Sequence, residues 1–368
     1  MPGKLSVHVV SDVDDDVLAG LELYRSMAHP DLGPEVVRDW LYWFEENPFG
    51  RPSIALASLD GEIVGMHSLI PSRSSLGGKI VPSAKGEFFV VRPDCSSLME
   101  SQSGLRLALA LPKLAREHAA ANGVRFTFGV PARTALLSGQ VTGARLISWE
   151  TLAFVAPARF SGLEGGGITR AAGVAGMLAL GRLKRSVRRL WRSVVAAGFE
   201  VEAAGFEVEA AKEFTKVSPS ARIAANHLFA HDPDLLNFRF PDPHYCKYRL
   251  VQRGEEVAQF VFTAPKKKKG SIMSLKFWSS IPALDQGLAS LLVRVIRDAG
   301  SGGAELVRLE IPKSNPETGR ELKQMGFMQR KNKSHVALTW CATESLTKTR
   351  DEESWDSTNA HSGWYQLN

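Results

Sequence analysis

The sequence predicts an α/β (α+β) protein built from two similar halves, residues 35–155 and 232–340. Each half contains a hairpin of two apolar strands with a glycine near the tip of its turn, Gly61 in the first and Gly254 in the second. Glycine supplies the positive φ that such tight turns require. A further strand, a long helical stretch and another strand follow the hairpin in both halves. This repeated order predicts two domains in tandem.

Two helices are predicted ahead of the first hairpin. Residues 11–29 alternate acidic and apolar positions, as a surface helix does, and Ser11 or Asp12 can cap its N-terminus. A second helix runs to about Glu46, and Pro34 suits its first turn because no helical hydrogen bond is lost there.

The rest of the first half alternates strands with one long helix. Residues 86–91 are mostly aromatic or β-branched, which favours a strand. Leucines and alanines recur through 104–121 and predict a helix, which Pro112 should kink. Further strands are predicted at 124–129 and near 147–154.

The segment between the halves differs from both. A Gly165-Gly166-Gly167 joint precedes residues 168–195, where basic and apolar residues alternate as in a basic amphipathic helix. Such a helix either packs its apolar stripe on the body of the protein or makes peripheral contact with an anionic membrane. The unit 197–203 is then repeated once, and we expect the second copy to enter a sheet. The predicted ranges are an N-terminal domain at 1–160, a linker at 161–205, a C-terminal domain at 206–341 and a polar tail at 342–368.

Composition limits the class of protein. The chain has 368 residues, of which 44% are hydrophobic and 23% charged, as in ordinary soluble proteins. No apolar run reaches the roughly 18 residues of a membrane span, and the first residues lack the apolar stretch of a signal peptide. We therefore expect a cytoplasmic protein with no membrane span. Cys95, Cys246 and Cys341 are too widely spaced to indicate a zinc site or a disulfide framework, so no metal is predicted.

The net charge of +6 invites a nucleic-acid hypothesis. The basic residues, however, gather in two runs, 182–192 and 266–269. The second run lies between predicted strands, where a solvated loop explains it. Nucleic acid is therefore not the partner that we expect, although tRNA is kept as an alternative below.

The order of elements resembles that of tandem members of the acetyl-coenzyme A-dependent N-acetyltransferase (GNAT) superfamily, of the type found in bacterial polysaccharide and amino-sugar biosynthesis. The resemblance covers most of 35–155 and 232–340, and implies in each domain a mixed, mostly antiparallel sheet flanked by helices. It also implies acetyl-CoA or another acyl-CoA as cofactor, and a small-molecule amine, such as an amino sugar or a natural-product intermediate, as acceptor. The matching motifs are Asn47-Pro48-Phe49-Gly50, 60–65, Gly77-Gly78-Lys79, 91–94, 128–131, 232–240, Gly302-Gly303-Ala304 and Met325-Gly326-Phe327.

The resemblance places the cofactor at the end of the fourth strand. In the family, main-chain N–H groups at a helix N-terminus hold the pyrophosphate, where the helix dipole also favours an anion. This chain lacks the family's arginine and first glycine in that loop. The expected cofactor-binding residues are Val90, Val91, Ser101, Gln102, Ser103, Gly104 and Leu105.

Candidate catalytic residues follow from the same resemblance. Glu87, at the start of the fourth strand, is expected to act as the base or else to be a solvated carboxylate. His67, on the returning hairpin strand, is the second catalytic candidate, and Arg133 and Phe128 are candidates for contact with the acceptor. Asp285 would repel phosphate, so the second half is expected to be structural or to shape the substrate site.

Two alternatives to this enzyme remain open. One is a non-catalytic scaffold or binding protein built on the same fold. The other is an aminoacyl-tRNA-dependent transferase, as in Fem-like relatives that also pair two such domains. The sequence does not indicate the oligomeric state.

Overall fold

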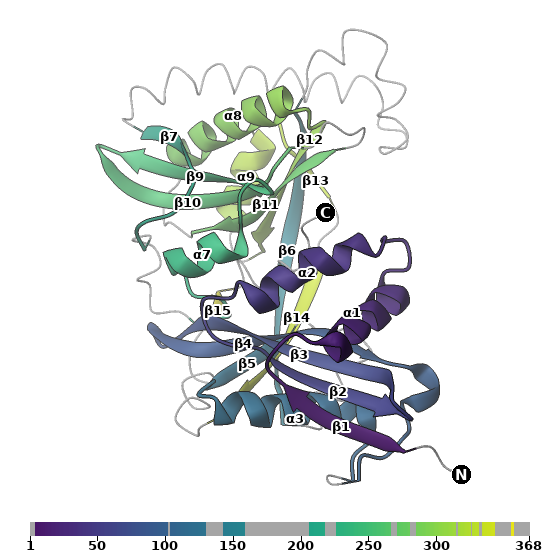
Figure 1. Ribbon diagram of the computed structural model, residues 1–368. Coiled ribbons are helices and arrows are strands. Elements are labelled where there is room, and N and C mark those ends of the chain that lie inside the picture. Colours follow the sequence, from purple (N-terminus) through teal and green to yellow (C-terminus); the bar gives the residue numbers. More distant parts are fainter. Residues whose placement is uncertain are drawn as a thin grey trace.

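The computed structural model in Figure 1 describes residues 4–101, 104–129, 143–158, 206–217, 226–265, 271–279, 285–313, 316–324, 326–330, 333–342 and 355–356. The first half contains β1 (Leu5–Val10), α1 (Asp15–Ala28), α2 (Glu35–Glu45), β2 (Ser53–Leu59), β3 (Glu62–Leu76), β4 (Lys79–Val91), η1 (Pro93–Cys95), α3 (Leu107–Ala121), β5 (Phe126–Gly129) and β6 (Arg145–Pro157). The second half contains β7 (Phe206–Ala211), β8 (Asn226–His227), α7 (Pro233–Arg239), β9 (Tyr245–Gln252), β10 (Glu255–Thr263), β11 (Ile272–Trp278), α8 (Asp285–Gly302), β12 (Leu306–Pro312), α9 (Pro316–Gln324), β13 (Met328–Gln329), β14 (Lys333–Cys341) and β15 (Trp355–Asp356).

The described strands form a continuous sheet that passes through both halves. Its main path runs β1-β2-β3-β4-β5-β14-β6-β12-β11-β10-β9-β7. Most neighbours are antiparallel, while β4 and β5 are parallel in the first half and β11 and β12 in the second. Helices flank the sheet in both halves (Figure 1). The predicted fold class is confirmed as far as the architecture goes: the chain is of α+β type, with two similar halves of mixed, mostly antiparallel sheet flanked by helices.

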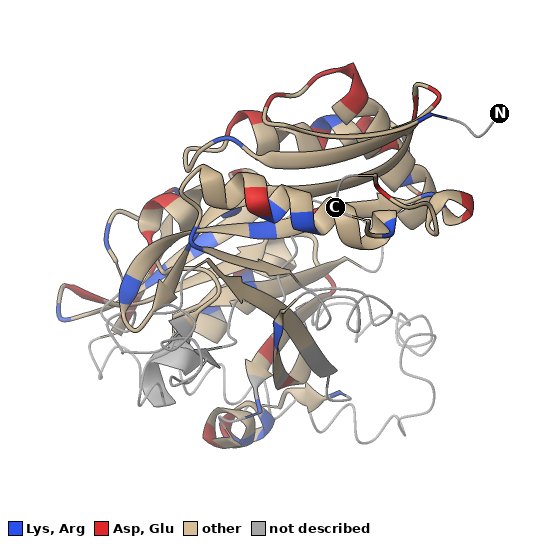
Figure 2. Ribbon diagram, turned by 90° about the horizontal axis from the view of Figure 1, so that it is seen from below, with Lys and Arg blue, Asp and Glu red and all other residues tan. Residues whose placement is uncertain are grey.

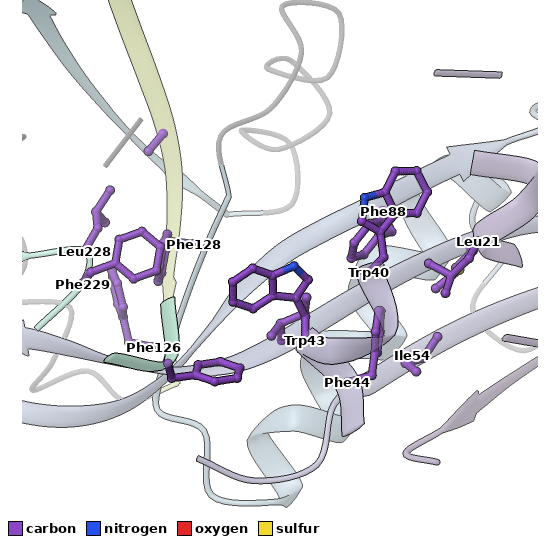
Figure 3. Close-up of a cluster of buried hydrophobic side chains, with 14 of the residues drawn as sticks. Leu21, Trp40, Trp43, Phe44, Ile54, Phe88, Phe126, Phe128, Leu228 and Phe229 are labelled. Carbon is purple, nitrogen blue, oxygen red and sulfur yellow. The ribbon is translucent and has the colours of Figure 1, made fainter. Parts of the chain in front are cut away.

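The helices ahead of the hairpin form as predicted, but the first begins later. Asp14 caps α1 through its carboxylate, which accepts the Val17 N–H at 2.9 Å, so the predicted caps Ser11 and Asp12 are wrong. In α2, Trp40 and Trp43 recur at a spacing that puts both on one buried face. Figure 3 shows these two indoles in the core of the first half, close to residues of the sheet and of α1.

Both predicted hairpins are present. The first turns at Asp60 and Gly61, with φ of 54° and 88°, and the second at Arg253 and Gly254, with φ of 53° and 80°. Two consecutive positive φ values match the right-handed twist of the flanking strands. The fourth strand is longer than predicted, since β4 starts at Lys79 and not at residue 86.

The two halves exchange strands, which the repeated sequence order did not predict. β6 pairs with β14 from Arg145 to Thr151, and with β12 from Thr151 to Pro157. β14 in turn pairs with β5 of the first half. Each half therefore contributes a strand to the sheet of the other. The predicted domain ranges 1–160 and 206–341 stay a prediction, because strands from both ranges cross between the sheets.

The segment between the halves is described only in part. The second copy of the short repeat supplies β7, as expected. The basic segment 168–195, the lysine run 266–269 and most of the tail 342–368 lie outside the described residues. In the part that is described, basic and acidic residues are mixed along the elements (Figure 2). None of the helices described combines the length and the apolar character that a membrane crossing needs.

Candidate functional site

In the first half, the described pairing of β4 with β5 stops before the C-terminal end of β4. The two strands pair from Ser83 opposite Phe126 to Gly86 opposite Gly129. β4 continues to Val91 along β3, and the described residues place no strand on its other side there. Since Arg92 donates its N–H to Val64 O at 2.8 Å, the adjacent main-chain groups of Val91 point away from β3, toward the side on which β5 pairs with earlier residues of β4. Within the described residues, this arrangement leaves the strand-edge donor and acceptor of Val91 available to an extended ligand.

A β-bulge bends β4 at the same place. Phe88 and Phe89 together oppose His67 on β3, because the register shifts between Met66 and Ser68. Phe88 has φ of 50°, a conformation that costs a residue with a side chain about 1–2 kcal/mol. Its buried ring packs against aromatic rings of α1 and α2, which holds the strained backbone in place. Bulges of this kind re-aim side chains and are frequent beside active sites.

The loop between β4 and α3 is tightly hydrogen-bonded. Gly104, with φ of 64°, donates its N–H to Glu100 O at 2.9 Å, and Glu100 donates to Leu105 O at 2.8 Å. The Gly104 N–H is therefore not free for a phosphate in this structure. The N–H groups of Ser101 and Ala108 have no protein acceptor among the described residues. Ala108 lies in the first turn of α3, where the helix dipole favours an anion.

Arg106 is a candidate that the sequence analysis missed. It is the N-cap residue of α3, is exposed, and forms no ion pair within the described part of the chain. A cation at a helix N-terminus opposes the dipole, and arginine is not a preferred N-cap. Helix stability does not favour an arginine here, so Arg106 is a candidate for contact with an anion. The signal in the sequence was an arginine two residues after Gly104.

Glu87 is buried and paired. Its carboxylate contacts the Lys85 ammonium on the same face of β4, and the two side chains are only 7% and 3% exposed. The alternative of a solvated carboxylate is therefore wrong. Burial, and secondly the positive charge of Arg239, hold the pKa of Lys85 well below its usual range. Ser68 adds a hydrogen bond from its hydroxyl to Glu87 O at 3.0 Å.

Residues 229–232 of the second half pack against the first half beside this pair. Ala230 donates to Arg73 O at 2.8 Å, and Arg73 forms an ion pair with Asp232. Phe229 meets Phe128 of β5 edge-on at 4.9 Å, and Figure 3 shows the two rings together.

Arg239 adds a further contact to these residues. Its guanidinium carbon lies 3.4 Å from the centre of the Phe229 ring. Burial lowers the Arg239 pKa to about 9. Beneath it, Phe128 is fully buried, so this structure gives an acceptor no surface of that ring, and its predicted role stays a prediction.

His67 lies on the opposite face of the sheet from Glu87. A Cβ added to Gly86 would come within 3.2 Å of the His67 ring, which shows that the imidazole covers the last residue of the β4–β5 ladder. Its Nδ1 is buried without a hydrogen-bond partner in the described structure. Glu87 and His67 therefore do not form one catalytic pair. Gln102, Ser103 and Arg133, predicted for the cofactor and the acceptor, lie outside the described residues.

The corresponding opening of the second half is filled. β11 and β12 pair only from Ile272 to Ser274 on β11, and both strands then continue. Apolar side chains close the space beyond and leave a cavity of about 10 Å³, which is room for one water at most. The residues that line it are Phe260, Phe262, Leu275, Trp278, Leu291, Leu292, Leu309, Ile311, Thr318 and Leu322.

Comparison with known proteins identifies the fold. No family model matches the chain, and no curated protein matches its sequence. A GCN5-related N-acetyltransferase from Anabaena variabilis matches in structure with a TM-score of 0.56 at 11% identity, over 93% of this chain and 74% of that chain. A tandem GNAT protein from the clavulanic acid biosynthesis pathway matches with 0.50 at 14% identity, over 92% and 99%. Saccharomyces cerevisiae N-myristoyltransferase with bound myristoyl-CoA matches with 0.50 at 13% identity, over 90% and 80%.

These likenesses define the chain as a protein with a tandem GNAT fold. At such low identity they establish the fold alone. The activity has to be argued from the residues of the site.

Proposed function

We propose that the chain transfers an acyl group from an acyl-coenzyme A to an amine, at the site of the first half. The end of the β4–β5 ladder beside the N-terminus of α3 carries this proposal. There, the main chain of Val91 offers a strand edge to the pantetheine arm, and Ala108 and Arg106 offer an N–H and a positive charge to the diphosphate. Bound there, the coenzyme supplies an activated thioester.

The proposed chemistry is direct transfer. The acceptor nitrogen bonds to the acyl carbon while the C–S bond breaks. Overall, the nitrogen loses one proton and the departing sulfur gains one. Glu87 receives the proton from nitrogen, and Lys85 holds its carboxylate in position. The filled opening of the second half supports a single transfer site per chain, with residues 226–240 shaping the acceptor side. Acetyl as the acyl group, an amino sugar or natural-product amine as the acceptor, and a cytoplasmic location are the finer parts of this proposal.

Calorimetric titration with coenzyme A and acetyl-CoA tests the proposal. We expect micromolar to millimolar binding that weakens with added salt, because exposed charges are screened. Arg106→Ala should weaken binding about tenfold, which corresponds to ~1.4 kcal/mol. Lys79→Ala removes one exposed charge at the far end of β4 and should change nothing.

The other outcomes separate the alternatives. No binding at millimolar coenzyme A would support the scaffold and overturn the enzyme. Binding of tRNA with a steep salt dependence, in place of coenzyme A, would support the Fem-like alternative. A mass-spectrometric screen of amines with acetyl-CoA would then identify the acceptor.

A further inference from the structure

A group of small residues lies on the α3 face of the sheet, where the described β4–β5 ladder ends. Ala84 and Gly86 of β4 stand opposite Thr127 and Gly129 of β5. Ala84 belongs to the cluster that packs under α3, so these four positions face that helix. A Cβ added to Gly129 would meet, among the described atoms within 4 Å, only Gly86 O at 3.9 Å. Among the described residues, no side chain covers Gly129, whereas the His67 ring covers Gly86.

Three polar groups that have no hydrogen-bond partner among the described residues lie around these positions. Thr127 is 7% exposed, and its hydroxyl has no partner in the part of the chain that the structure describes. The buried Nδ1 of His67 also has none. The third group is Arg116 of α3, whose guanidinium lies 4.5 Å from the ring centre of Trp340. Trp340 of β14 is the register partner of Thr127, so the guanidinium lies above the strand next to that hydroxyl.

Arg116 forms no ion pair with a described carboxylate, although the nearby charge of Glu117 acts to raise its pKa. Its neighbour Glu117 instead pairs with Lys113, at 3.7 Å. Burial lowers the Arg116 pKa to about 10, which leaves the side chain charged at neutral pH. Burial, followed by the nearby charge of Arg116, lowers the pKa of His67 to about 3, so the imidazole is neutral. A fixed cation, a neutral imidazole and a hydroxyl together complement an anion.

The position of Arg116 along α3 matches the end of the ladder. α3 connects β4 to β5 along the chain, and these two strands are parallel. The helix therefore runs back along β4, antiparallel to both strands. Arg116 lies nine residues beyond Leu107, about 14 Å along the helix axis. Gly86 lies five residues before Val91, about 16 Å along the strand. A chain that enters at the N-terminus of α3 and follows β4 reaches both at similar depth.

We propose that the acyl group of the donor ends in a carboxylate, as in malonyl or succinyl thioesters, and that Arg116 binds this carboxylate with help from Thr127 and His67. The inference rests on the proposed function, because it takes the acyl-CoA to lie along β4. A guanidinium stacked on an aromatic ring keeps its in-plane N–H groups free to bind a carboxylate in bidentate fashion.

Titration of the unmodified protein tests the proposal without any variant. Succinyl-CoA and butanoyl-CoA have the same number of acyl carbons and differ in the terminal charge. We expect succinyl-CoA to bind about 10- to 100-fold more tightly, as one charge-assisted contact predicts. Equal affinities for the two thioesters would overturn the proposal.

A pair of variants on α3 assigns the effect to Arg116. Arg116→Met should abolish the preference and leave butanoyl-CoA binding within about threefold, whereas Lys113→Met, which removes an exposed charge from the same helix, should preserve it. Thermal melting checks that both variants are folded. A preference that survives Arg116→Met would also overturn the proposal. Binding of coenzyme A without any preference refutes this inference alone, whereas no binding of coenzyme A refutes the proposed function as well.

Discussion

Variants of the buried pair Lys85 and Glu87 test whether this ion pair stabilises the candidate site. Glu87→Gln leaves the Lys85 side chain, which is 3% exposed, without its carboxylate. Removing one partner of a buried ion pair typically costs about 3–5 kcal/mol, and we expect a loss in this range at pH 7. Lys85→Met should cost a similar amount, because Glu87 is then the unpaired buried charge. The double variant Lys85→Met/Glu87→Leu should recover most of the loss, since no buried charge remains.

The pH dependence of the stability of the Glu87→Gln variant is an independent test of the buried charge on Lys85. Burial, and then the charge of Arg239, hold the pKa of Lys85 well below its usual range. Removal of the neighbouring carboxylate should lower this pKa further, because an opposite charge favours the charged form. Above the folded pKa, the unfolded chain binds the Lys85 proton and the folded variant does not. Stability should therefore rise with pH, by up to about 1.4 kcal/mol per pH unit, until it levels off near the unfolded pKa of about 10.4.

Urea unfolding followed by tryptophan fluorescence at pH 7, 8 and 9 measures both effects. The wild type should show the smaller slope, because Glu87 helps the folded state to retain the proton. Two results would refute the reasoning: single-variant losses that simply add in the double variant, or a Glu87→Gln variant whose stability does not change with pH.

Two further predictions concern the contact between the halves. Phe229→Ala should lower the free energy of unfolding by about 3–5 kcal/mol, because it removes a ring that is 1% exposed and that contacts both Phe128 and Arg239. Leu18→Ala, at a position 37% exposed, should lower it by under about 1 kcal/mol in the same urea titration. Equal losses for the two variants would contradict this assignment. A fragment of residues 1–160 should fail to unfold cooperatively, because it lacks β14 between β5 and β6 and exposes both strand edges; a sharp unfolding transition of the fragment would show that the strand exchange is dispensable.

The local elements were predictable because neighbouring residues determine them. Asp60-Gly61 between two apolar strands specifies a tight turn, and the structure has positive φ at both positions. The leucine and alanine repeat of 104–121 specifies α3, although the helix starts three residues later than its pattern suggested. The cap of α1 was misplaced because Ser11, Asp12 and Asp14 are all acceptable N-cap residues, and only the position of Val17 decides among them.

The site was predictable only in outline. The resemblance placed the candidate site at the end of β4, because the order of the elements reflects how the strands and helices are connected. The pairing of Glu87 with Lys85, and the separation of Glu87 from His67 across the sheet, depend on strand register and on the bulge at Phe88. A bulge shifts register without any strong sequence signal. Arg106 was overlooked because the family motif expects its arginine before the glycine, not after it.

The sequence by itself determined the doubled α+β architecture, the hairpins and the helices, because turn glycines and apolar periodicity act over a few residues. Only the tertiary structure decided that β6 and β14 cross between the halves, that Phe229 covers Phe128, and that Arg116 lies over Trp340. These contacts join segments more than a hundred residues apart in most cases. Which distant strands pair, and which charges become buried, depends on how complete surfaces fit together, and no local pattern encodes that fit.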